Sequence, residues 1–445
     1  MNLSRIVAAC AGVAFAAAWG FDPGTEAFRL LKRDVPSVQP SSNPPELVDV
    51  APDSTDTDSV SAPVAPRPSA PFATGRLIRV ALDEGKAAVT CDLRGSWMAP
   101  SGQKLTGKAT ARLDPQGVVL ETMTARVDLG SGGVLRSDAG TFCFGPKCFR
   151  GQVRFERVGS GIALVNQLPL EDYLLGVVPG EIGRRLDPRF GEAVRAQAIV
   201  ARTYTLRALG QYTGKPWDVR DDVRDQVYDG LKGEDPLCTR GVRSTTGQIL
   251  ADGSGKPIDA YYHSTSGGHT ADIRDVWPGK AVQPYLSGVD DTAPDGRAWG
   301  GAALVADWSE RWPIEQLHEA VRRDLSDALG RKVDPGPVKA LRLEGRDRSG
   351  RARKLVVEAE NGIFEVPSDR IRWALRRPAK GRPILRSTRF ELAIVNGEYL
   401  AEGTGYGHGV GMSQNGAMGR AFAGQSFQQI LSAYYPGTVL RTLEP

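Results

Sequence analysis

Two segments of this 445-residue chain gather side chains that could do chemistry, and the first is rich in histidine. Residues 261–269 read YYHSTSGGH and contain two of the four histidines, His263 and His269. Asp275 follows His269 by six residues, the same step that separates the two histidines. Two imidazoles and a carboxylate would suit zinc, so a three-ligand metal site can be drawn. A spacing of six is no established signature, and the alternative is a polar loop that binds no metal.

The second segment is a run in which every second residue from Gly403 to Gly411 is glycine. In an extended chain, such a run has one face without side chains, which backbone or a ligand can approach closely. His408, Ser413 and Gln414 would then stand beside this bare face as polar contacts for a ligand. The alternative is a packing seam lined by glycine. The run is not a dinucleotide fingerprint, because the GxGxxG spacing is absent.

A helix predicted over residues 190–209 carries two arginines on one face. Arg195 and Arg202 are seven residues apart, which places them about 20° from each other around the helix axis. Ile199 and Leu206 share their stripe, which suggests a half-buried face whose guanidinium groups are directed at a carboxylate or an anionic ligand. The alternative is a solvated stripe on which Glu192 and Arg195 form an ion pair.

Three other kinds of site are excluded by their patterns. His318 begins a segment that resembles the HExxH zinc motif, but the fifth residue is Arg322. Residues 253–256 lack the length and the Ser/Thr of a phosphate loop, and no GxSxG nucleophile elbow occurs.

The elements that must position these segments are mostly strands in the first half of the chain. Alternating apolar and polar residues between 77 and 168, separated by turn signals, predict antiparallel strands. A short helix and turn over 168–181, the helix over 190–209, an amphipathic helix over 308–329 and a hairpin over 340–366 follow. The sequence therefore predicts an α+β fold with mostly antiparallel strands, a few helices and a two-lobed body.

The N-terminus predicts export. Arg5 precedes an uncharged run over residues 6–21, which is shorter than the roughly 20 residues that span a bilayer and ends in small residues. We expect residues 1–18 to be a signal peptide and residues 19–75 to be a disordered tether rich in Pro, Ser and Asp. Between residues 36 and 75 there are nine prolines, five acidic residues and one arginine, too little apolar content to offset the entropy of ordering.

Export would also oxidise the cysteines. Once Cys10 is removed with the signal peptide, four remain: Cys91, Cys143, Cys148 and Cys238. A Gly-Pro turn lies between Cys143 and Cys148, so we expect a disulfide that closes a hairpin there. The pairing of Cys91 and Cys238 is left open.

Composition narrows the class of protein. Hydrophobic residues make up 41% and charged residues 24%, which is typical of a globular protein and excludes collagen, a coiled coil and a polytopic membrane protein. The whole chain carries +4. The acidic tether leaves the part after residue 75 mildly basic, which suits an anionic polymer as the ligand.

Several ordered motifs resemble the stage II sporulation protein D (SpoIID/LytB) family. They lie at residues 168–181 (LPLEDYLLGVVPGE), 192–204 (EAVRAQAIVARTY), 263–268 (HSTSGG), 405–414 (GYGHGVGMSQ) and 434–437 (YYPG). The resemblance spans about residues 150–445. It implies a catalytic region at 161–445 with an insertion at about 295–375 and a central cleft for glycan. The alternating residues before it predict a separate β-rich N-terminal region at 76–160, which the family motifs do not cover.

The resemblance implies an exported lytic transglycosylase, a carbon-oxygen lyase that cuts peptidoglycan glycan strands already stripped of stem peptides. The catalytic glutamate of the family falls on Glu181. Glu181 follows two valines and a proline, so burial could keep its carboxyl protonated near neutral pH. The expected substrate-binding residues are Arg195, Arg202, Tyr204, His263, His408, Ser413 and Gln414.

The resemblance also leaves an alternative, a wall-binding protein without catalysis that recruits or stimulates a cell-wall amidase. Some family members have cysteines, which look like zinc ligands, after the histidine that matches His263. Here those positions are His269 and Asp275, so no metal cofactor is expected, although zinc stays possible. The expected partners are glycan strands and possibly an amidase in the periplasm or cell envelope, and no nucleic acid.

Overall fold

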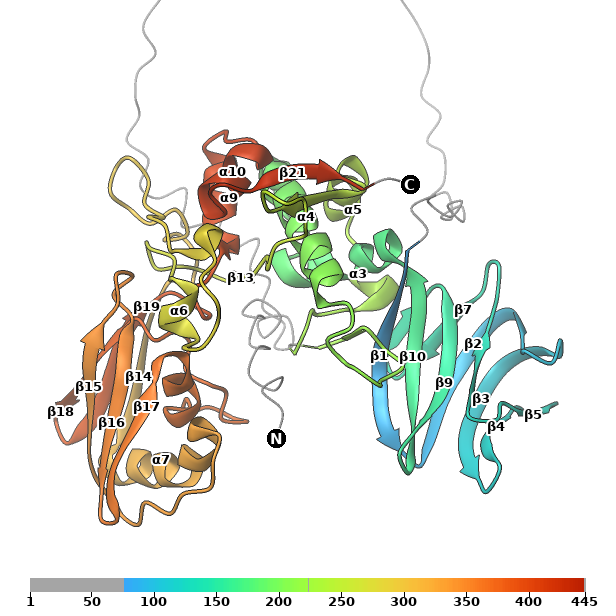
Figure 1. Cartoon of the computed structure of the whole chain (residues 1–445), viewed down its shortest axis with the longest axis horizontal. Helices are drawn as coiled ribbons and strands as arrows, with labels where there is room; N and C mark the ends of the chain where they lie inside the picture. The colour runs from blue at the N-terminus through green and yellow to red at the C-terminus, as the bar shows by residue number, and fades with distance from the viewer. Residues whose placement is uncertain (1–75, 223, 444–445) are drawn as a thin grey trace, which may run out of the picture.

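The computed structural model describes residues 76–222 and 224–443 (Figure 1). The predicted signal peptide and tether lie outside these residues. No helix in the described part of the chain is long and apolar enough to cross a membrane.

The N-terminal part is built from two sheets of almost entirely antiparallel strands. The six-stranded sheet has the order β5-β4-β3-β2-β7-β8, and the five-stranded sheet has the order β11-β1-β10-β9-β6. The strands of the first are β2 (Ala88–Met98), β3 (Lys104–Asp114), β4 (Gly117–Glu121), β5 (Arg126–Asp128), β7 (Thr141–Phe144) and β8 (Lys147–Phe149). Those of the second are β1 (Leu77–Lys86), β6 (Gly132–Leu135), β9 (Gln152–Val158), β10 (Gly161–Pro169) and β11 (Val219–Arg220), which pairs with β1 in parallel.

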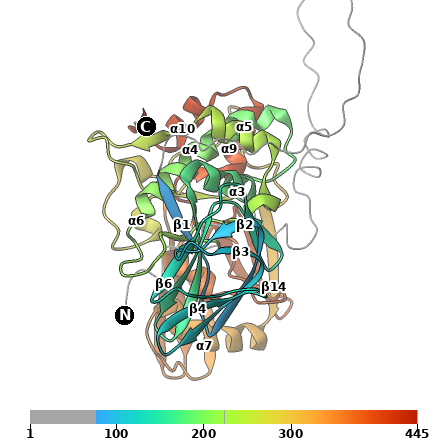
Figure 2. The ribbon, with the colours of Figure 1, turned by 90° about the vertical axis from the view of Figure 1, so that its right-hand side faces the viewer.

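A layer of helices follows these sheets and holds the candidate site. It contains α3 (Leu170–Ile182), α4 (Gly191–Ala208), α5 (Pro236–Ser244), α9 (Gln414–Phe422) and α10 (Phe427–Tyr434). Two short strand pairs join distant parts of the chain: β12 (Gln248–Ala251) with β21 (Val439–Thr442), and β13 (Tyr262–His263) with β20 (Met412–Ser413). Viewed from the side of the N-terminal sheets, these helices lie above the strands (Figure 2).

Residues 307–404 form a second body with its own core. It contains two three-stranded sheets and two helices. The strand order of the first sheet is β14 (Asp307–Pro313), β19 (Glu398–Thr404) and β18 (Phe390–Val395), and that of the second is β15 (Val338–Arg346), β16 (Ala352–Ala359) and β17 (Gly362–Pro367). The helices are α7 (Ile314–Leu329) and α8 (Ile371–Ala374). Figure 1 shows it on the left, with the N-terminal sheets on the right and the helical layer between them.

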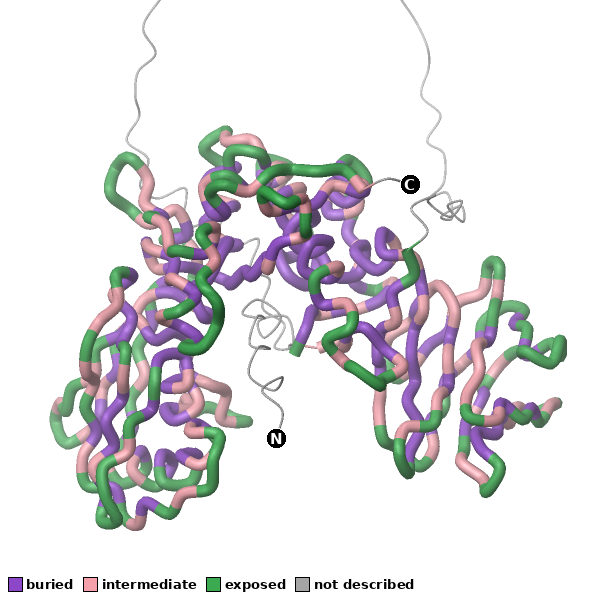
Figure 3. Tube along the Cα trace, in the orientation of Figure 1, coloured by how far each residue is buried: buried purple, intermediate pink, exposed green. Residues whose placement is uncertain are grey.

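The apolar side chains are divided between two large cores. One runs from the N-terminal sheets through α3, α4 and α10, so the β-rich region packs with the helices into one unit. The other lies within residues 308–401. Figure 3 shows buried residues along the central helices and inner strands, with exposed residues in the outer loops. The α+β prediction is confirmed.

Three local predictions need correction. The predicted turn near Glu181 is absent, because α3 continues through Pro179 to Ile182. The helix expected over 308–329 begins only at Ile314, and Trp308 and Trp312 lie on one face of strand β14. The sequence did not distinguish the two structures, because residues four apart share a face in a helix and also in a strand. The hairpin predicted over 340–366 gains a third strand, β17.

One of the two cysteine predictions is confirmed and the other is wrong. The disulfide between Cys143 and Cys148 is present and joins the paired strands β7 and β8, as predicted. Cys91 and Cys238 are free thiols, which corrects the expectation that all four would be oxidised. Cys91 is buried in the six-stranded sheet and Cys238 within α5, and burial raises the pKa of the Cys91 thiol to about 12.

Candidate active site

Glu181 lies in the last turn of α3, at the end of a helix whose residues are almost all buried. Gly180, just before it, lets the segment around Val227 pack closely on the helix. A Cβ at Gly180 would lie 3.1 Å from the carbonyl oxygen of Val227. Glu181 is therefore held against a second segment 46 residues away in sequence.

The Glu181 carboxyl is almost completely buried and accepts hydrogen bonds from three directions. Its side chain is 2% exposed. The backbone N–H of Val227 donates to Oε1 at 3.0 Å, and the side chains of Tyr262 and Gln414 also hydrogen-bond to the carboxyl. Burial raises the pKa of Glu181 to about 7, since the loss of solvation outweighs the three hydrogen bonds, which favour the ionised form. This carboxyl can therefore release and recover a proton near neutral pH.

Tyr262 and Gln414 reach Glu181 because two strands that are far apart in sequence pair in parallel. Tyr262 pairs with Met412, and His263 pairs with Ser413. Gln414 is the first residue of α9, which Ser413 caps by accepting a hydrogen bond from the N–H of Gly416. The amide nitrogen of Gln414 also donates to the backbone oxygen of Glu181 at 2.9 Å, so α9 is tied to the end of α3.

The glycine-rich run is a packing seam and does not form the bare, extended face that the alternation predicts. Gly405, Gly407, Gly409 and Gly411 all have φ between +73° and +112°, a left-handed conformation in which the chain turns repeatedly. A Cβ at Gly407 would lie 2.7 Å from that of His263, and a Cβ at Gly409 or Gly411 would lie still closer to another residue. Glycine is needed here because neighbouring segments occupy the space.

An arginine from the second body fills part of this seam. Arg351 is 1% exposed and lies where a side chain at Gly409 would stand. Its guanidinium donates to the carbonyl oxygens of Ser266, at 2.9 Å, and His269, at 3.0 Å. The second body therefore fixes the loop that follows β13.

His263 and His408 lie together inside this packing and are each 1% exposed, with ring centroids 5.6 Å apart. Burial lowers the pKa of His263 to about 3, and the charge of Arg351 adds to the effect. Burial also lowers the pKa of His408. Both imidazoles are therefore neutral at physiological pH and buried away from solvent.

The three-ligand metal site that the six-residue spacing suggested is not assembled. Asp275 forms an ion pair with Arg353 at 2.9 Å, and His269 contacts the carbonyl oxygen of Thr270 through Nδ1. Within residues 76–222 and 224–443, no group of three or more His, Cys, Asp or Glu side chains could hold a metal ion. The six-residue step does not bring these side chains together, because the loop turns away after Gly267 and Gly268, both with positive φ.

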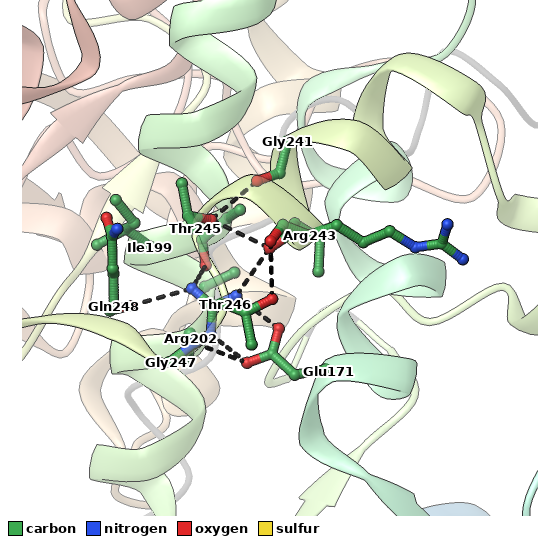
Figure 4. Close-up of polar contacts among 12 residues, drawn as sticks. Glu171, Ile199, Arg202, Gly241, Arg243, Thr245, Thr246, Gly247 and Gln248 are labelled. Carbon is green, nitrogen blue, oxygen red and sulfur yellow. Dashed lines mark hydrogen bonds and ion pairs between the residues drawn. The ribbon is translucent and has the colours of Figure 1, made fainter. Parts of the chain in front are cut away.

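Arg195 and Arg202, predicted to share a face of α4, have different surroundings. Arg195 is partly exposed and forms an ion pair with Glu192 at 2.9 Å, as the alternative reading of the stripe expected. Arg202 is fully buried and forms a bidentate pair with Glu171, with both contacts at 2.7 Å (Figure 4). It also donates to the carbonyl oxygen of Gln248 at 3.0 Å. Arg202 is thus occupied by a buried structural network.

The remaining predicted residues are buried around Tyr262 and β20. Tyr204 is 7% exposed and contacts the ring of Tyr262 edge to face. Ser413 has no exposed surface, and its hydroxyl also accepts from the N–H of Ser266 at 3.3 Å. The structure thus brings Gln414 directly to Glu181. It places Tyr204, His263 and Ser413 in the surrounding shell.

Sequence reasoning missed several residues that build the site. Val227 and Tyr262 contact Glu181 directly. Asp291 joins two motif segments and helix α9: it accepts from Ser266 and Tyr434, each at 2.7 Å, and pairs with Arg420 at 3.3 Å. Tyr262 was visible beside the histidines, but no local signal points from Asp291 to its partners.

One exposed arginine that lies near Glu181 in the sequence has no polar side-chain partner in the described part of the chain. Arg185 follows Glu181 by four residues, and its side chain makes no ion pair or hydrogen bond with the described residues. Its φ of +54° is unfavourable for a residue other than glycine, and its N–H donates to Asp235 at 2.9 Å. Its neighbour Arg184, by contrast, pairs with Asp229.

Comparison with known proteins identifies similar sequences. A family described as Stage II sporulation protein matches residues 158–251, and a domain of unknown function matches residues 305–411. The chain is 30% identical to stage II sporulation protein D of Bacillus amyloliquefaciens over 293 residues, which is 61% of this chain and 74% of that protein.

Two further relatives extend the similarity. An uncharacterized protein of Brachyspira hyodysenteriae is 27% identical over 82% of this chain and 93% of its own length. The amidase enhancer of Bacillus subtilis is 29% identical over 60% of this chain, but the match covers only 40% of that longer protein.

Proposed function

Because this chain belongs to the family of stage II sporulation protein D, we propose that it is an exported lytic transglycosylase that cleaves peptidoglycan glycan strands lacking stem peptides. The observation that carries the proposal is the Glu181 carboxyl, buried beside three hydrogen-bond donors with its pKa raised to about 7. A single carboxyl with this pKa can serve as general acid and then as general base.

The reaction needs no water and no second carboxylate. Glu181 protonates the glycosidic oxygen as its bond to the anomeric carbon of N-acetylmuramic acid breaks. The N–H of Val227 and the hydroxyl of Tyr262 then stabilise the carboxylate. The C6 hydroxyl of the same sugar attacks the anomeric carbon and gives its proton to Glu181, which leaves a 1,6-anhydro end and restores the acid. This differs from glycosidases that use a pair of carboxylates.

Arg185 is the cation that we assign to the substrate. Removing the stem peptide converts an amide on the lactyl group into a free carboxylate, which an exposed guanidinium can bind. Arg202 is engaged by Glu171 and Arg195 by Glu192, whereas Arg185 is free and follows the general acid by four residues. Substrate binding by Arg195 stays a prediction.

A second candidate function is stimulation of a cell-wall amidase without catalysis. One relative is named an amidase enhancer, and Glu181 is only 2% exposed in this conformation, which limits access of a glycosidic oxygen. Under this alternative, the protein binds strands and releases no product.

One experiment separates the two candidates. The purified protein is incubated alone with amidase-treated peptidoglycan, and the soluble fragments are analysed by mass spectrometry. We expect anhydro-ended fragments from the wild type and none from Glu181→Gln, whose fold should persist because the amide has nearly the same shape. Glu234→Gln is the control, since burial also raises the pKa of that carboxyl although it is only partly buried, and this variant should retain activity. Strand binding without fragments in the wild type would favour the second candidate.

A further inference from the structure

We infer that Gln226 is a positioning residue for Glu181: it donates to the phenol oxygen of Tyr262 and thereby commits the hydroxyl hydrogen of Tyr262 to the Glu181 carboxyl. Gln226 itself does not touch the reacting atoms. The inference rests on the proposed role of Glu181 as the acid and base.

Gln226 has no exposed surface and is surrounded by polar partners from three elements. Its amide nitrogen donates to the hydroxyl oxygen of Tyr262 at 3.3 Å and to the carbonyl oxygen of Ala201 at 3.4 Å. Its amide oxygen faces the hydroxyls of Thr205, at 2.7 Å, and Tyr173, at 3.4 Å.

These partners fix which way the amide points. A backbone carbonyl can only accept, so the side of the amide that faces Ala201 must be the nitrogen. The oxygen then faces Thr205 and Tyr173, whose hydroxyls can donate to it. The carbonyl oxygen of Ala201 also accepts from the hydroxyl of Thr205 at 2.8 Å. An inverted amide would set its oxygen 3.4 Å from this carbonyl oxygen, so two acceptors would face each other inside the core with no hydrogen between them.

The orientation of Gln226 decides the orientation of Tyr262. A phenol has one hydrogen, and its oxygen here accepts from the amide nitrogen of Gln226. The hydrogen is therefore free to point to the Glu181 carboxyl, with which Tyr262 is hydrogen-bonded. The next residue along the chain, Val227, donates its own N–H to the same carboxyl. Gln226 orients the hydroxyl of Tyr262, and the next residue, Val227, donates its own N–H, so these two residues set two of the three hydrogen bonds to the Glu181 carboxyl.

These donors balance the effect of burial. Burial alone would hold the proton on Glu181 too tightly for release to a leaving group, and hydrogen bonds to the carboxylate lower the pKa again. The titratable groups beside Glu181 are Tyr262 from β13 and Tyr173 from its own helix. Burial raises the pKa of Glu181 and the three hydrogen bonds lower it, and no charged side chain is among the causes of the shift.

The test measures the pKa of Glu181 directly in the full chain. Carbon-13 NMR follows the side-chain carboxyls of glutamate-labelled protein during a pH titration, and the resonance missing from Glu181→Gln identifies the site. We expect Gln226→Met, which keeps the shape but removes the amide, to raise the Glu181 pKa by up to about one unit. Tyr262→Phe should raise it by a similar amount, and the double variant should show no larger rise than Tyr262→Phe alone.

Two results would overturn the inference: an unchanged Glu181 pKa in folded Gln226→Met, or shifts that add in the double variant. If Gln226→Met does not fold, Gln226→Asn replaces it, because the shorter side chain keeps an amide but withdraws it from Tyr262. The pH profile of product release should move with the pKa. If wild-type protein releases no product while the NMR shifts appear as expected, the proposed function fails and the positioning role stands.

Discussion

Replacing Arg202 by leucine would test whether this residue supports the fold or binds substrate. In the structure its guanidinium pairs with both oxygens of Glu171 (Figure 4). The Arg202 side chain is 0% exposed and the Glu171 side chain is 6% exposed. After Arg202→Leu, the Glu171 carboxylate would stay buried, and the N–H of Gly247, at 3.3 Å, would still donate to it. Leaving one partner of a buried pair without the other costs about 3–5 kcal/mol.

The expected loss is large enough to measure without ambiguity. At about 2–3 °C per kcal/mol for a unit of this size, Arg202→Leu should lower the thermal midpoint by roughly 6–15 °C. Arg195→Leu is the matched control on the same helix. Its ion pair with Glu192 is partly exposed, and such pairs contribute about 0.3–0.5 kcal/mol, so its midpoint should move by about 1 °C.

A double variant separates the buried charge from the lost packing. Glu171→Leu combined with Arg202→Leu removes both charges and should recover much of the stability, because an apolar pair can replace a buried ion pair. Thermal and urea unfolding are measured beside binding to peptide-free glycan strands. If Arg202→Leu proves as stable as Arg195→Leu but no longer binds strands, Arg202 is a substrate ligand and the structural reasoning is wrong.

Three further predictions follow from the site. Release of anhydro-ended product should fall as the pH rises through about 7, because the reaction begins with protonated Glu181; initial rates between pH 5 and 9 show whether it does. Gly407→Ala should lower the free energy of unfolding by about 2–5 kcal/mol, because φ is +112° and the new carbon would meet His263. Gly424→Ala, at φ +86° but in open space, should lower it by only about 1–2 kcal/mol. Urea unfolding measures both values, and equal losses would contradict the packing seam. Arg185→Gln should weaken binding of peptide-free strands about five- to tenfold and hardly alter binding of strands that keep their peptides, and an equal loss for both would remove its assigned role.

Local features could be predicted from the sequence because they depend on the chain's own geometry. The helix over 190–209 follows from apolar periodicity, and the Cys143–Cys148 disulfide follows from two cysteines on either side of a turn. The ordered motifs around Glu181 and Gln414 were enough to indicate the family, since several specific motifs in one order rarely coincide by chance.

Periodicity did not reveal what covers a face. It placed Arg195 and Arg202 on one stripe of α4, but α3 supplies Glu171 to Arg202 and leaves Arg195 at the surface. The alternating glycines suggested an open face, yet Arg351 and the neighbouring strand fill it. A pattern records which side chains point together and contains no information on the segment that packs against them.

The surroundings of Glu181 are decided only by tertiary structure. Its donors come from Val227, Tyr262 and Gln414, which are 46, 81 and 233 residues away in the sequence and meet because β13 pairs with β20. The amino-acid order is enough to show that a glutamate follows an apolar segment in a family motif. Its raised pKa depends on burial by those distant segments, because desolvation is a property of everything packed around the carboxyl and not of its neighbours in the chain.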